Sequence, residues 1–290
     1  MKFTIAAFIL IISLNALGQT IPSDIKKIVN FIYADSAKKV PLGTGFFVGI
    51  RDTLSNSKEI YTYLVTAKHV LKQNGIFLNK IFVRINRKDS LSEIGELRIN
   101  TNGSEKNVYM HSDSTVDIAV LPVNIDSKIF DFKVITNDFL TNRKSFKTLG
   151  IKEGSDVFFT GMFTPFLGDK KNYPIVRFGR VALVTEEKIK WDNEMTELYL
   201  VESTTYGGNS GSPVFFYLGI DRGDGSIQLG SPEIKLAGIM KGYFGESIPI
   251  SIVETKKIPV SQINLGIAAV VPSYYLQEIL YCKELVNQRK

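Results

Sequence analysis

The chain has 290 residues, of which 44% are hydrophobic and 22% charged, and its formal net charge is +6. These proportions are typical of a soluble globular protein. The basic residues are scattered in pairs, as at Lys26-Lys27 and Lys170-Lys171, whereas a nucleic-acid-binding surface needs a dense basic patch with interleaved aromatic residues. Nucleic acid is therefore not expected as a partner. Aromatic and β-branched residues are common and helical periodicity is scarce, which indicates an all-β body of one large domain or two barrels.

The first segment, Met1 to Gln19, is typical of a secretory signal peptide. Lys2 gives it a positive start, Phe3 to Leu14 is almost wholly apolar, and Ala16-Leu17-Gly18 supplies the small residues of a cleavage site after Gly18. An uncleaved membrane anchor is the alternative, but this apolar core is shorter than the roughly 20 residues of a spanning helix. No other long apolar segment follows, so we expect no stable membrane anchor after cleavage.

Two further segments carry a histidine and an aspartate in apolar surroundings. The run Tyr61 to Leu71 is rich in β-branched and aromatic residues, which predicts a strand that leads into His69. Histidine is the side chain whose unperturbed pKa, about 6.5, suits the acceptance and return of a proton near neutral pH. Asp117 stands at the front of an apolar run that ends at Val123, where solvation alone does not explain a carboxylate. Both residues are candidates for acid–base chemistry.

The segment Glu202 to Phe216 contains Gly-Gly-Asn-Ser-Gly-Ser-Pro just before a β-type run. Its glycines, Gly207, Gly208 and Gly211, free the backbone to turn sharply and to approach a ligand closely. Successive N–H groups in such a turn can point into one concavity and stabilise a negative oxygen, with the hydroxyl of Ser210 beside it. The alternative is a plain loop between two strands, since glycine and serine are common loop residues.

Together these three segments resemble the motifs of trypsin-like (chymotrypsin-fold) serine peptidases. The matching elements are Thr66-Ala67-Lys68-His69, the run Asp-Ile-Ala-Val-Leu that starts at Asp117, and the loop around Ser210, in the family's order of histidine, aspartate and serine. The loop most resembles those of bacterial glutamyl endopeptidases, and the chain is also similar to HtrA protease domains without a PDZ module. The resemblance implies His69 as general base, Asp117 as the acid that orients it and Ser210 as nucleophile. It implies an oxyanion hole formed by the N–H groups of Gly208 and Ser210.

The resemblance also implies the fold, which is two six-stranded antiparallel β-barrels with a C-terminal helix. The expected division is a signal peptide over 1–18, an N-terminal barrel with His69 and Asp117 over 19–148, and a C-terminal barrel with Ser210 over 149–290. Gly43 to Gly49 corresponds to the family's strand beneath the histidine. Short strands or connections are expected at 76–86, 93–99 and 107–110, and strands at 155–162, 175–185, 197–202, 213–218, 235–243 and 263–271. Apolar residues at helical spacing predict that Ser273 to Lys290 forms the terminal helix.

The resemblance also implies which residues set the substrate preference. In the family, three segments line the pocket for the side chain before the scissile bond, and they correspond here to 202–207, 238–243 and 266–270. The substrate-binding residues implied in this way are Thr204, Met240, Lys241 and Gly242. Trypsins carry an aspartate where this chain has Thr204, so a basic preference is disfavoured. Two preferences stay open. One is an acidic side chain that pairs with Lys241, although this chain lacks the histidine that glutamyl endopeptidases use. The other is a small-to-medium apolar side chain.

The sequence thus predicts a serine endopeptidase that hydrolyses protein or peptide substrates through an acyl-enzyme, without a cofactor. No metal site is expected, since the other histidine, His111, lies in a polar segment without ligands at useful spacing and is expected at the surface. Cys282 is the only cysteine, so no intramolecular disulfide can form. An exported family member without disulfides fits a bacterial enzyme, periplasmic or extracellular.

The rival interpretation of the whole chain is a latent or non-catalytic module that binds peptides or a partner on the same scaffold. Trp191 is expected at the edge of a strand, and Asp221 to Gly225 is expected to form a hairpin turn. The sequence does not indicate an oligomeric state.

Overall fold

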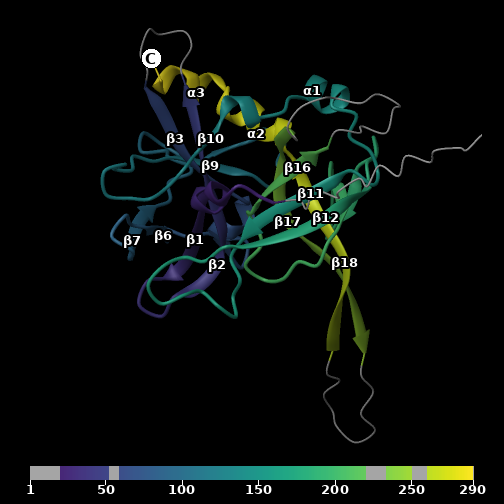
Figure 1. Cartoon of the computed structure of the whole chain (residues 1–290), viewed down its shortest axis with the longest axis horizontal. Coiled ribbons are helices and arrows are strands. Elements are labelled where there is room, and N and C mark those ends of the chain that lie inside the picture. Colours follow the sequence, from purple (N-terminus) through teal and green to yellow (C-terminus); the bar gives the residue numbers. More distant parts are fainter. Residues whose placement is uncertain (1–19, 52–58, 220–232, 250–259, 290) are drawn as a thin grey trace, which may run out of the picture.

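The computed structural model describes residues 20–51, 59–219, 233–249 and 260–289, and Figure 1 shows their arrangement. The predicted signal peptide and the predicted turn at Asp221–Gly225 lie outside the described residues. Strands dominate the described part of the chain, in two β bodies that lie side by side, with short helices along one side of them. The predicted all-β class is confirmed.

The first body is a sheet of eight strands from the N-terminal half of the chain. Seven of them follow the order β7-β6-β1-β2-β3-β9-β8, and the eighth, β10, pairs with β2 in parallel. The strands are β1 (Val29–Asp35), β2 (Val40–Arg51), β3 (Ile60–Thr66), β6 (Lys80–Asn86), β7 (Ser92–Arg98), β8 (Tyr109–Met110), β9 (Ala119–Pro122) and β10 (Ile135–Thr136). The hydrogen bonds between its strands do not close into a barrel, because β7 and β8 at the two ends of this order do not pair, whereas a closed six-stranded barrel was expected. The outer strand β7 is largely exposed and carries Glu93, Glu96 and Arg98, and charges on an edge strand oppose further pairing.

The second body is a closed six-stranded barrel in the order β11-β12-β15-β18-β17-β16, antiparallel throughout. Its strands are β11 (Asp156–Gly161), β12 (Ile175–Leu183), β15 (Tyr199–Glu202), β16 (Pro213–Leu218), β17 (Glu233–Pro249) and β18 (Val260–Pro272). The last two are longer than predicted and continue out of the barrel as a two-stranded ribbon (Figure 1). A β-bulge lies at Lys241, because Met240 and Gly242 pair with the consecutive residues Val270 and Ala269. Bulges re-aim a side chain and are common beside active sites.

Short elements complete the described chain. Two small hairpins pair β4 (Lys72–Gln73) with β5 (Ile76–Phe77) and β13 (Ile189–Trp191) with β14 (Glu194–Thr196). The helices are η1 (Ser23–Ile28), η2 (Lys68–Leu71), η3 (Asn137–Phe139), α1 (Arg143–Thr148), α2 (Ser273–Leu280) and α3 (Lys283–Gln288), the first three being 3-10 helices. The single C-terminal helix predicted from the sequence is therefore two helices. They are separated because Cys282 has an extended backbone, with φ −62° and ψ 152°.

One hydrophobic cluster joins the two bodies. It contains Phe46 and Leu64 of the first sheet and Phe158 and Phe215 of the barrel, all fully buried, and the rings of the last two stack with 5.0 Å between centroids. Apolar burial of this extent stabilises the junction, and close packing fixes its geometry. Loops that meet at the junction are consequently held in defined positions.

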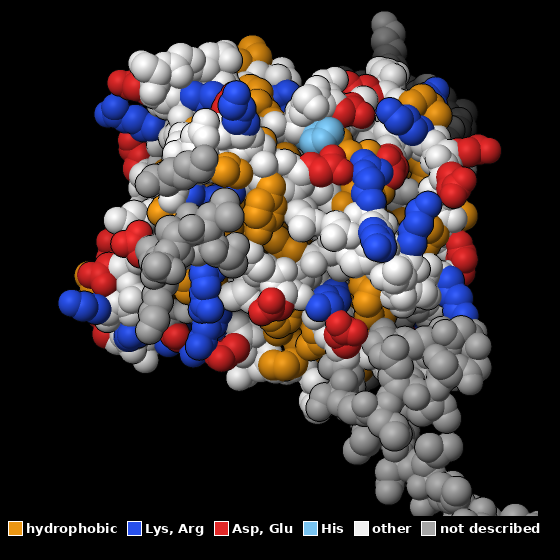
Figure 2. Space-filling view, turned by 90° about the horizontal axis from the view of Figure 1, so that it is seen from above, with side chains coloured by type: hydrophobic (Ala, Val, Ile, Leu, Met, Phe, Trp, Pro, Cys, Tyr) orange, Lys and Arg blue, Asp and Glu red, His pale blue; other side chains and the backbone are white. Residues whose placement is uncertain are grey.

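One face of the molecule shows a surface of mixed charge. On the face shown in Figure 2, Lys and Arg side chains are interspersed with Asp and Glu side chains and with apolar groups.

Candidate active site

The loop between β15 and β16 presents Ser210 at the junction of the two bodies. Asn209 anchors this loop, because its buried side chain donates to the carbonyl of Met162 at 2.7 Å and accepts from the N–H of Tyr206 at 3.1 Å. Gly211 has φ +83°, and a Cβ there would lie 2.1 Å from the carbonyl oxygen of Thr44. Only glycine fits this conformation and this space.

His69 stands where β3 ends and the chain turns into η2. The neighbours of His69 on η2, Val70 and Leu71, are buried and hold the turn against the core, whereas the His69 side chain is 47% exposed. The residue after β3, Ala67, is also buried. The predicted strand is β3, and β3 together with η2 places the imidazole of His69 at the surface of the junction.

Asp117 lies in the loop before β9, and only 4% of its side chain is exposed. Its Oδ2 accepts from Nδ1 of His69 at 2.6 Å and its Oδ1 accepts from the N–H of His69 at 2.9 Å. Burial raises the pKa of Asp117, but the hydrogen bonds and charge of His69 and the ammonium of Lys241 outweigh it, so this pKa lies well below the usual range of a carboxyl. Asp117 is therefore ionised at neutral pH.

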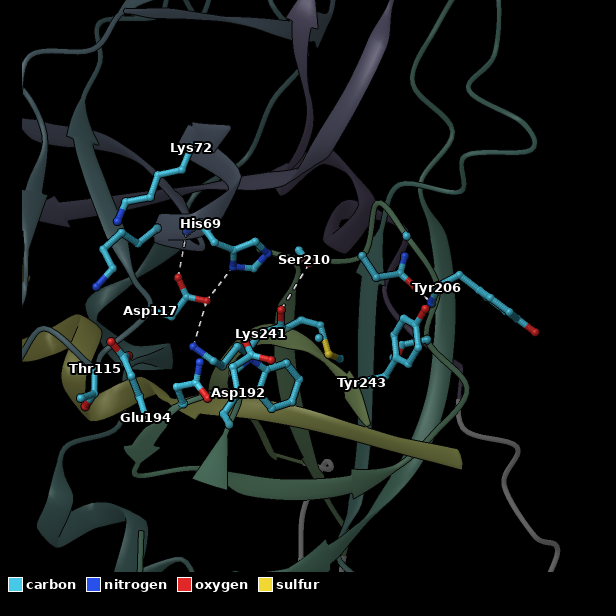
Figure 3. A pocket seen from close by; sticks show the side chains of 18 of the residues that line it. His69, Lys72, Thr115, Asp117, Asp192, Glu194, Tyr206, Ser210, Lys241 and Tyr243 are labelled. Atoms are coloured by element: carbon cyan, nitrogen blue, oxygen red, sulfur yellow. Dashed lines mark hydrogen bonds and ion pairs between the residues drawn. The ribbon is translucent and has the colours of Figure 1, made fainter. Parts of the chain in front are cut away.

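The structure brings the three predicted catalytic residues together. In Figure 3 the imidazole of His69 lies between the carboxylate of Asp117 and the side chain of Ser210. The hydroxyl of Ser210 donates to the carbonyl oxygen of Lys241 at 3.3 Å. For Ser210 to give its proton to His69, this hydroxyl must rotate away from Lys241, a small change about one side-chain bond.

The two amides predicted to form the oxyanion hole are available to a ligand. Among the described residues, the N–H groups of Gly208 and Ser210 donate to no protein acceptor. Gly208 has φ +93° and follows Gly207 in a turn closed by the bond from the Asn209 N–H to the carbonyl of Tyr206. A residue in the third position of a type II turn needs such a positive φ, so glycine is required at 208.

Thr44 supports this turn from the other β body and was not expected from the sequence. Its hydroxyl donates to the carbonyl oxygen of Gly208 at 2.7 Å and accepts from the N–H of Met162 at 2.9 Å. No motif singles out Thr44, although it lies inside the predicted strand Gly43 to Gly49. Its role depends on a contact between two distant segments.

A cleft of about 750 Å³ surrounds the site, lined by His69, Asp117, Ser210 and three of the four predicted substrate-binding residues, Met240, Lys241 and Gly242. The fourth, Thr204, is exposed and lies outside the lining, where its neighbour Thr205 takes its place. Side chains alternate between the two faces of an extended chain, so a shift of one residue exchanges the inward residue. The Thr205 hydroxyl is buried and has no hydrogen-bond partner among the described residues.

Lys241 points at the carboxylate of Asp117. Its Nζ lies 3.4 Å from Oδ2 of Asp117, and only 10% of its side chain is exposed (Figure 3). Trp191, at the end of β13, also lines the cleft, and a Cβ on Gly242 would lie 3.0 Å from its indole ring. The sequence indicated only a strand edge for Trp191.

His111 is less exposed than expected. Its side chain is 16% exposed, its Nε2 lies 3.0 Å from a carboxylate oxygen of Glu278, and its ring meets the ring of Tyr275 edge to face. It therefore anchors α2 rather than standing free at the surface. In the described part of the chain, no three His, Cys, Asp or Glu side chains are grouped so that they could hold a metal ion. Nor does that part contain a helix long and apolar enough to cross a membrane.

A closed β-barrel joined to a second β-sheet, with a histidine, an aspartate and a serine meeting at their junction, defines a chymotrypsin-type arrangement. The family model of the trypsin-like peptidase domain matches residues 43–219. The chain belongs to this family, as predicted. The finer resemblance to glutamyl endopeptidases and HtrA domains stays a prediction. A comparison with curated proteins finds no match.

Solved structures are similar in fold at low sequence identity. The MamO protease domain from Magnetospirillum magneticum, in its apo form, is 15% identical over 88% of this chain and 97% of that chain, with a TM-score of 0.50. Rv3671c from M. tuberculosis H37Rv, in the inactive form of a serine-to-alanine mutant, is 17% identical over 88% and 87%, with a TM-score of 0.42. A mutant of human heparin binding protein is 10% identical over 91% and 93%, with a TM-score of 0.48. At such identities the first match supports the fold alone.

Proposed function

We propose that the chain is a serine endopeptidase that hydrolyses peptide bonds through His69, Asp117 and Ser210. The observation that carries the proposal is the 2.6 Å hydrogen bond between His69 Nδ1 and the buried carboxylate of Asp117, with the opposite edge of the imidazole toward Ser210. A carboxylate at Nδ1 holds the ring in the tautomer that leaves Nε2 free to accept a proton.

The reaction is acyl transfer. As the oxygen of Ser210 bonds to the peptide carbonyl carbon, its proton passes to Nε2 of His69, and the N–H groups of Gly208 and Ser210 bind the carbonyl oxygen as it becomes negative. His69 then returns the proton to the leaving amine as the C–N bond breaks. Water attacks the acyl-enzyme by the same route and releases Ser210, while Asp117 stays ionised throughout.

The second candidate is a latent or non-catalytic module that binds peptides. The observation in its favour is the hydroxyl of Ser210, which donates to the Lys241 carbonyl rather than to His69. Catalytic hydrogen bonds are often long or misaligned without substrate and tighten in the complex. This contact therefore does not outweigh the arrangement of His69 and Asp117.

The test is covalent labelling of the mature protein with a fluorophosphonate probe, followed by intact-mass measurement. We expect one adduct on the wild-type protein and none on Ser210→Ala, because only an activated serine beside a formed oxyanion hole reacts quickly. A Ser203→Ala variant is the matched control, since Ser203 lies in the same segment but donates to the carbonyl of Phe178, and it should label. Absence of labelling in a folded wild-type sample would favour the latent or binding module.

The location we propose is outside the cytoplasm, in the periplasm or the extracellular space of a bacterium. Its support is the pattern of Met1 to Gln19, with a positive start, an apolar core and small residues before Gln19. N-terminal sequencing of the protein recovered from the producing cell should begin at Gln19. Recovery of the chain with Met1 still present would contradict the proposal.

The substrate we propose is an extended polypeptide in the cleft. Thr205 and Met240 line it, and Lys241 is engaged by Asp117. Because that ammonium is not free for an acidic substrate side chain, a small-to-medium apolar residue before the scissile bond is the preference we expect. Digestion of a peptide library is the direct measurement, and cleavage mainly after Glu or Asp would contradict it.

A further inference from the structure

Lys241 is held in an unusual position for a lysine. It occupies the bulge of β17, so its side chain leaves the alternation of the strand, and its Nζ lies 3.4 Å from Oδ2 of Asp117. The same oxygen accepts from Nδ1 of His69. Lysine is almost never fully buried unless it is paired, and here 10% of the lysine side chain and 4% of the aspartate side chain are exposed.

Aromatic side chains lie beside the ion pair of Lys241 and Asp117. The ring of Trp191 lies 5.7 Å from the Lys241 ammonium, a distance at which a cation is attracted to an aromatic face. Gly242 makes room for the indole, since a Cβ there would lie 3.0 Å from it. Trp191 is itself held by the ring of Phe244, edge to face at 5.0 Å. The bulge therefore places the Lys241 ammonium beside both the Asp117 carboxylate and the Trp191 indole, and the absence of a side chain at Gly242 leaves room for that indole.

We propose that Lys241 is a positioning residue that fixes the carboxylate of Asp117 and opposes the formation of a positive charge on His69. The catalytic role of Lys241 in this proposal rests on the proposed function of the chain as a serine endopeptidase. Its physical reason is that a like charge opposes the formation of a second one nearby. With Lys241 present, the negative charge of Asp117 is already balanced, so the carboxylate stabilises an imidazolium less than it would alone.

Four other charged side chains line the same cleft. They are Lys68 and Lys72 from η2 and β4, and Asp192 and Glu194 from the hairpin of β13 and β14. The Lys68 ammonium donates to the carbonyl of Ser114, and the Lys72 ammonium lies over the ring of Phe77 at 4.6 Å. In the described part of the chain, Lys241 is the cation in contact with Asp117 besides His69.

The first test compares the pH dependence of kcat/KM for the wild-type protein, Lys241→Met and Lys241→Arg. Methionine keeps an unbranched side chain without charge, and arginine keeps the charge. We expect the midpoint of the acid limb to rise by about one pH unit in Lys241→Met and to return toward the wild-type value in Lys241→Arg. A purely structural role would lower kcat/KM equally at all pH values. Lys72→Met is the matched control, because it removes a cleft lysine that does not contact Asp117, and its midpoint should stay near the wild-type value.

The second test does not need activity. The imidazole of His69 is titrated by NMR in Ser210→Ala and in Ser210→Ala with Lys241→Met, and His111→Gln identifies the one other histidine signal. A higher titration midpoint in the lysine variant supports the proposal, and an unchanged midpoint in a folded sample overturns it. Lys241→Gln replaces Lys241→Met if thermal melting indicates that the methionine variant does not fold. If labelling of Ser210 fails while this midpoint moves, the proposed function falls and the electrostatic coupling stands.

Discussion

The hydroxyl of Thr44 donates a 2.7 Å hydrogen bond to the carbonyl oxygen of Gly208, a residue 164 positions further along the chain. Thr44 belongs to β2 of the first sheet, and Gly208 belongs to the loop beside the barrel. The backbone of Thr44 holds the same loop two residues further on, because its N–H donates to the carbonyl of Ser210 at 2.8 Å. One threonine of the first body therefore fixes both residues of the predicted oxyanion hole.

Replacement of this threonine tests that support. In Thr44→Val the Gly208 carbonyl loses its donor and the Met162 N–H loses its acceptor. We expect kcat to fall about 10- to 100-fold through misplacement of the loop, and the free energy of unfolding to fall by about 1 to 3 kcal/mol. Steady-state kinetics and thermal melting are the measurements. Thr148→Val, which removes a hydroxyl bonded only within α1, should change neither by a comparable amount.

The left-handed backbone conformation of Gly208 leads to a second prediction. Alanine at 208 is strained at φ +93°, and its Cβ would lie 2.8 Å from a methyl carbon of Thr164. The turn must shift, so we expect Gly208→Ala to lose about 10²- to 10³-fold in kcat, the effect of removing one oxyanion donor. In Gly207→Ala the added Cβ meets nothing within 4 Å, so that variant controls for folding by its melting temperature. A Gly208→Ala protein with wild-type kcat would exclude this amide from the reaction.

Thr205 is predicted to influence substrate choice. Its hydroxyl is buried in the cleft lining without a partner among the described residues. Removal of an unpaired buried hydroxyl does not cost stability, so Thr205→Val should melt at or above the wild-type temperature. Its relative kcat/KM for polar over apolar side chains before the scissile bond should fall about 10-fold. The exposed Thr204→Val is the neighbouring control, and an equal change of preference in both variants would contradict the assignment.

Arg84 of β6 is predicted to be a major source of stability. Only 1% of it is exposed, and its guanidinium donates to the carbonyls of Leu167, Gly168 and Asp169 and to the hydroxyl of Ser92. Arg84→Met leaves three carbonyls without their donors, and since each unsatisfied buried polar group costs about 1 to 3 kcal/mol, we expect a loss of about 3 kcal/mol or more in the free energy of unfolding. Arg87→Met breaks only exposed ion pairs with Asp89 and Glu93. In denaturant titration Arg87→Met should therefore cost far less stability than Arg84→Met, because exposed ion pairs contribute little.

Glu197 links the barrel to α2 and predicts a pH dependence of stability. Burial raises its pKa, but the hydroxyls of Tyr274 and Tyr275 and the guanidinium of Arg143 outweigh it, so the pKa of Glu197 lies below its ordinary value. A carboxyl with a lowered pKa contributes stability above its unfolded value, about 4.3, and loses it as the pH falls further. Glu197→Gln should therefore be less stable than wild type by about 1 to 3 kcal/mol at pH 7, and this difference should shrink below about pH 4. Melting of both proteins from pH 3 to 7 measures it, with the exposed Glu105→Gln as control.

Much of the fold follows from local patterns. The run Pro213–Leu218 is a strand with the predicted ends, and the apolar run from Tyr61 forms β3 and the turn that carries His69. Local pattern does not reveal where a strand ends when its partner prolongs it, as in β17, whose pairing with β18 continues to Pro249. It also does not reveal the break of the C-terminal helix at Cys282, because apolar spacing continues through that residue.

The sequence alone was enough to predict which residues would carry the chemistry of a serine peptidase. Three short motifs around His69, Asp117 and Ser210 are recognisable because the turns and strand ends they form depend on neighbours within a few positions. Tertiary structure alone decided what surrounds them. Thr44 supports the loop, Thr205 rather than Thr204 faces the cleft, and Lys241 turns toward Asp117. Each of these depends on contacts between segments far apart in the chain and on a one-residue shift or bulge, which no local pattern records.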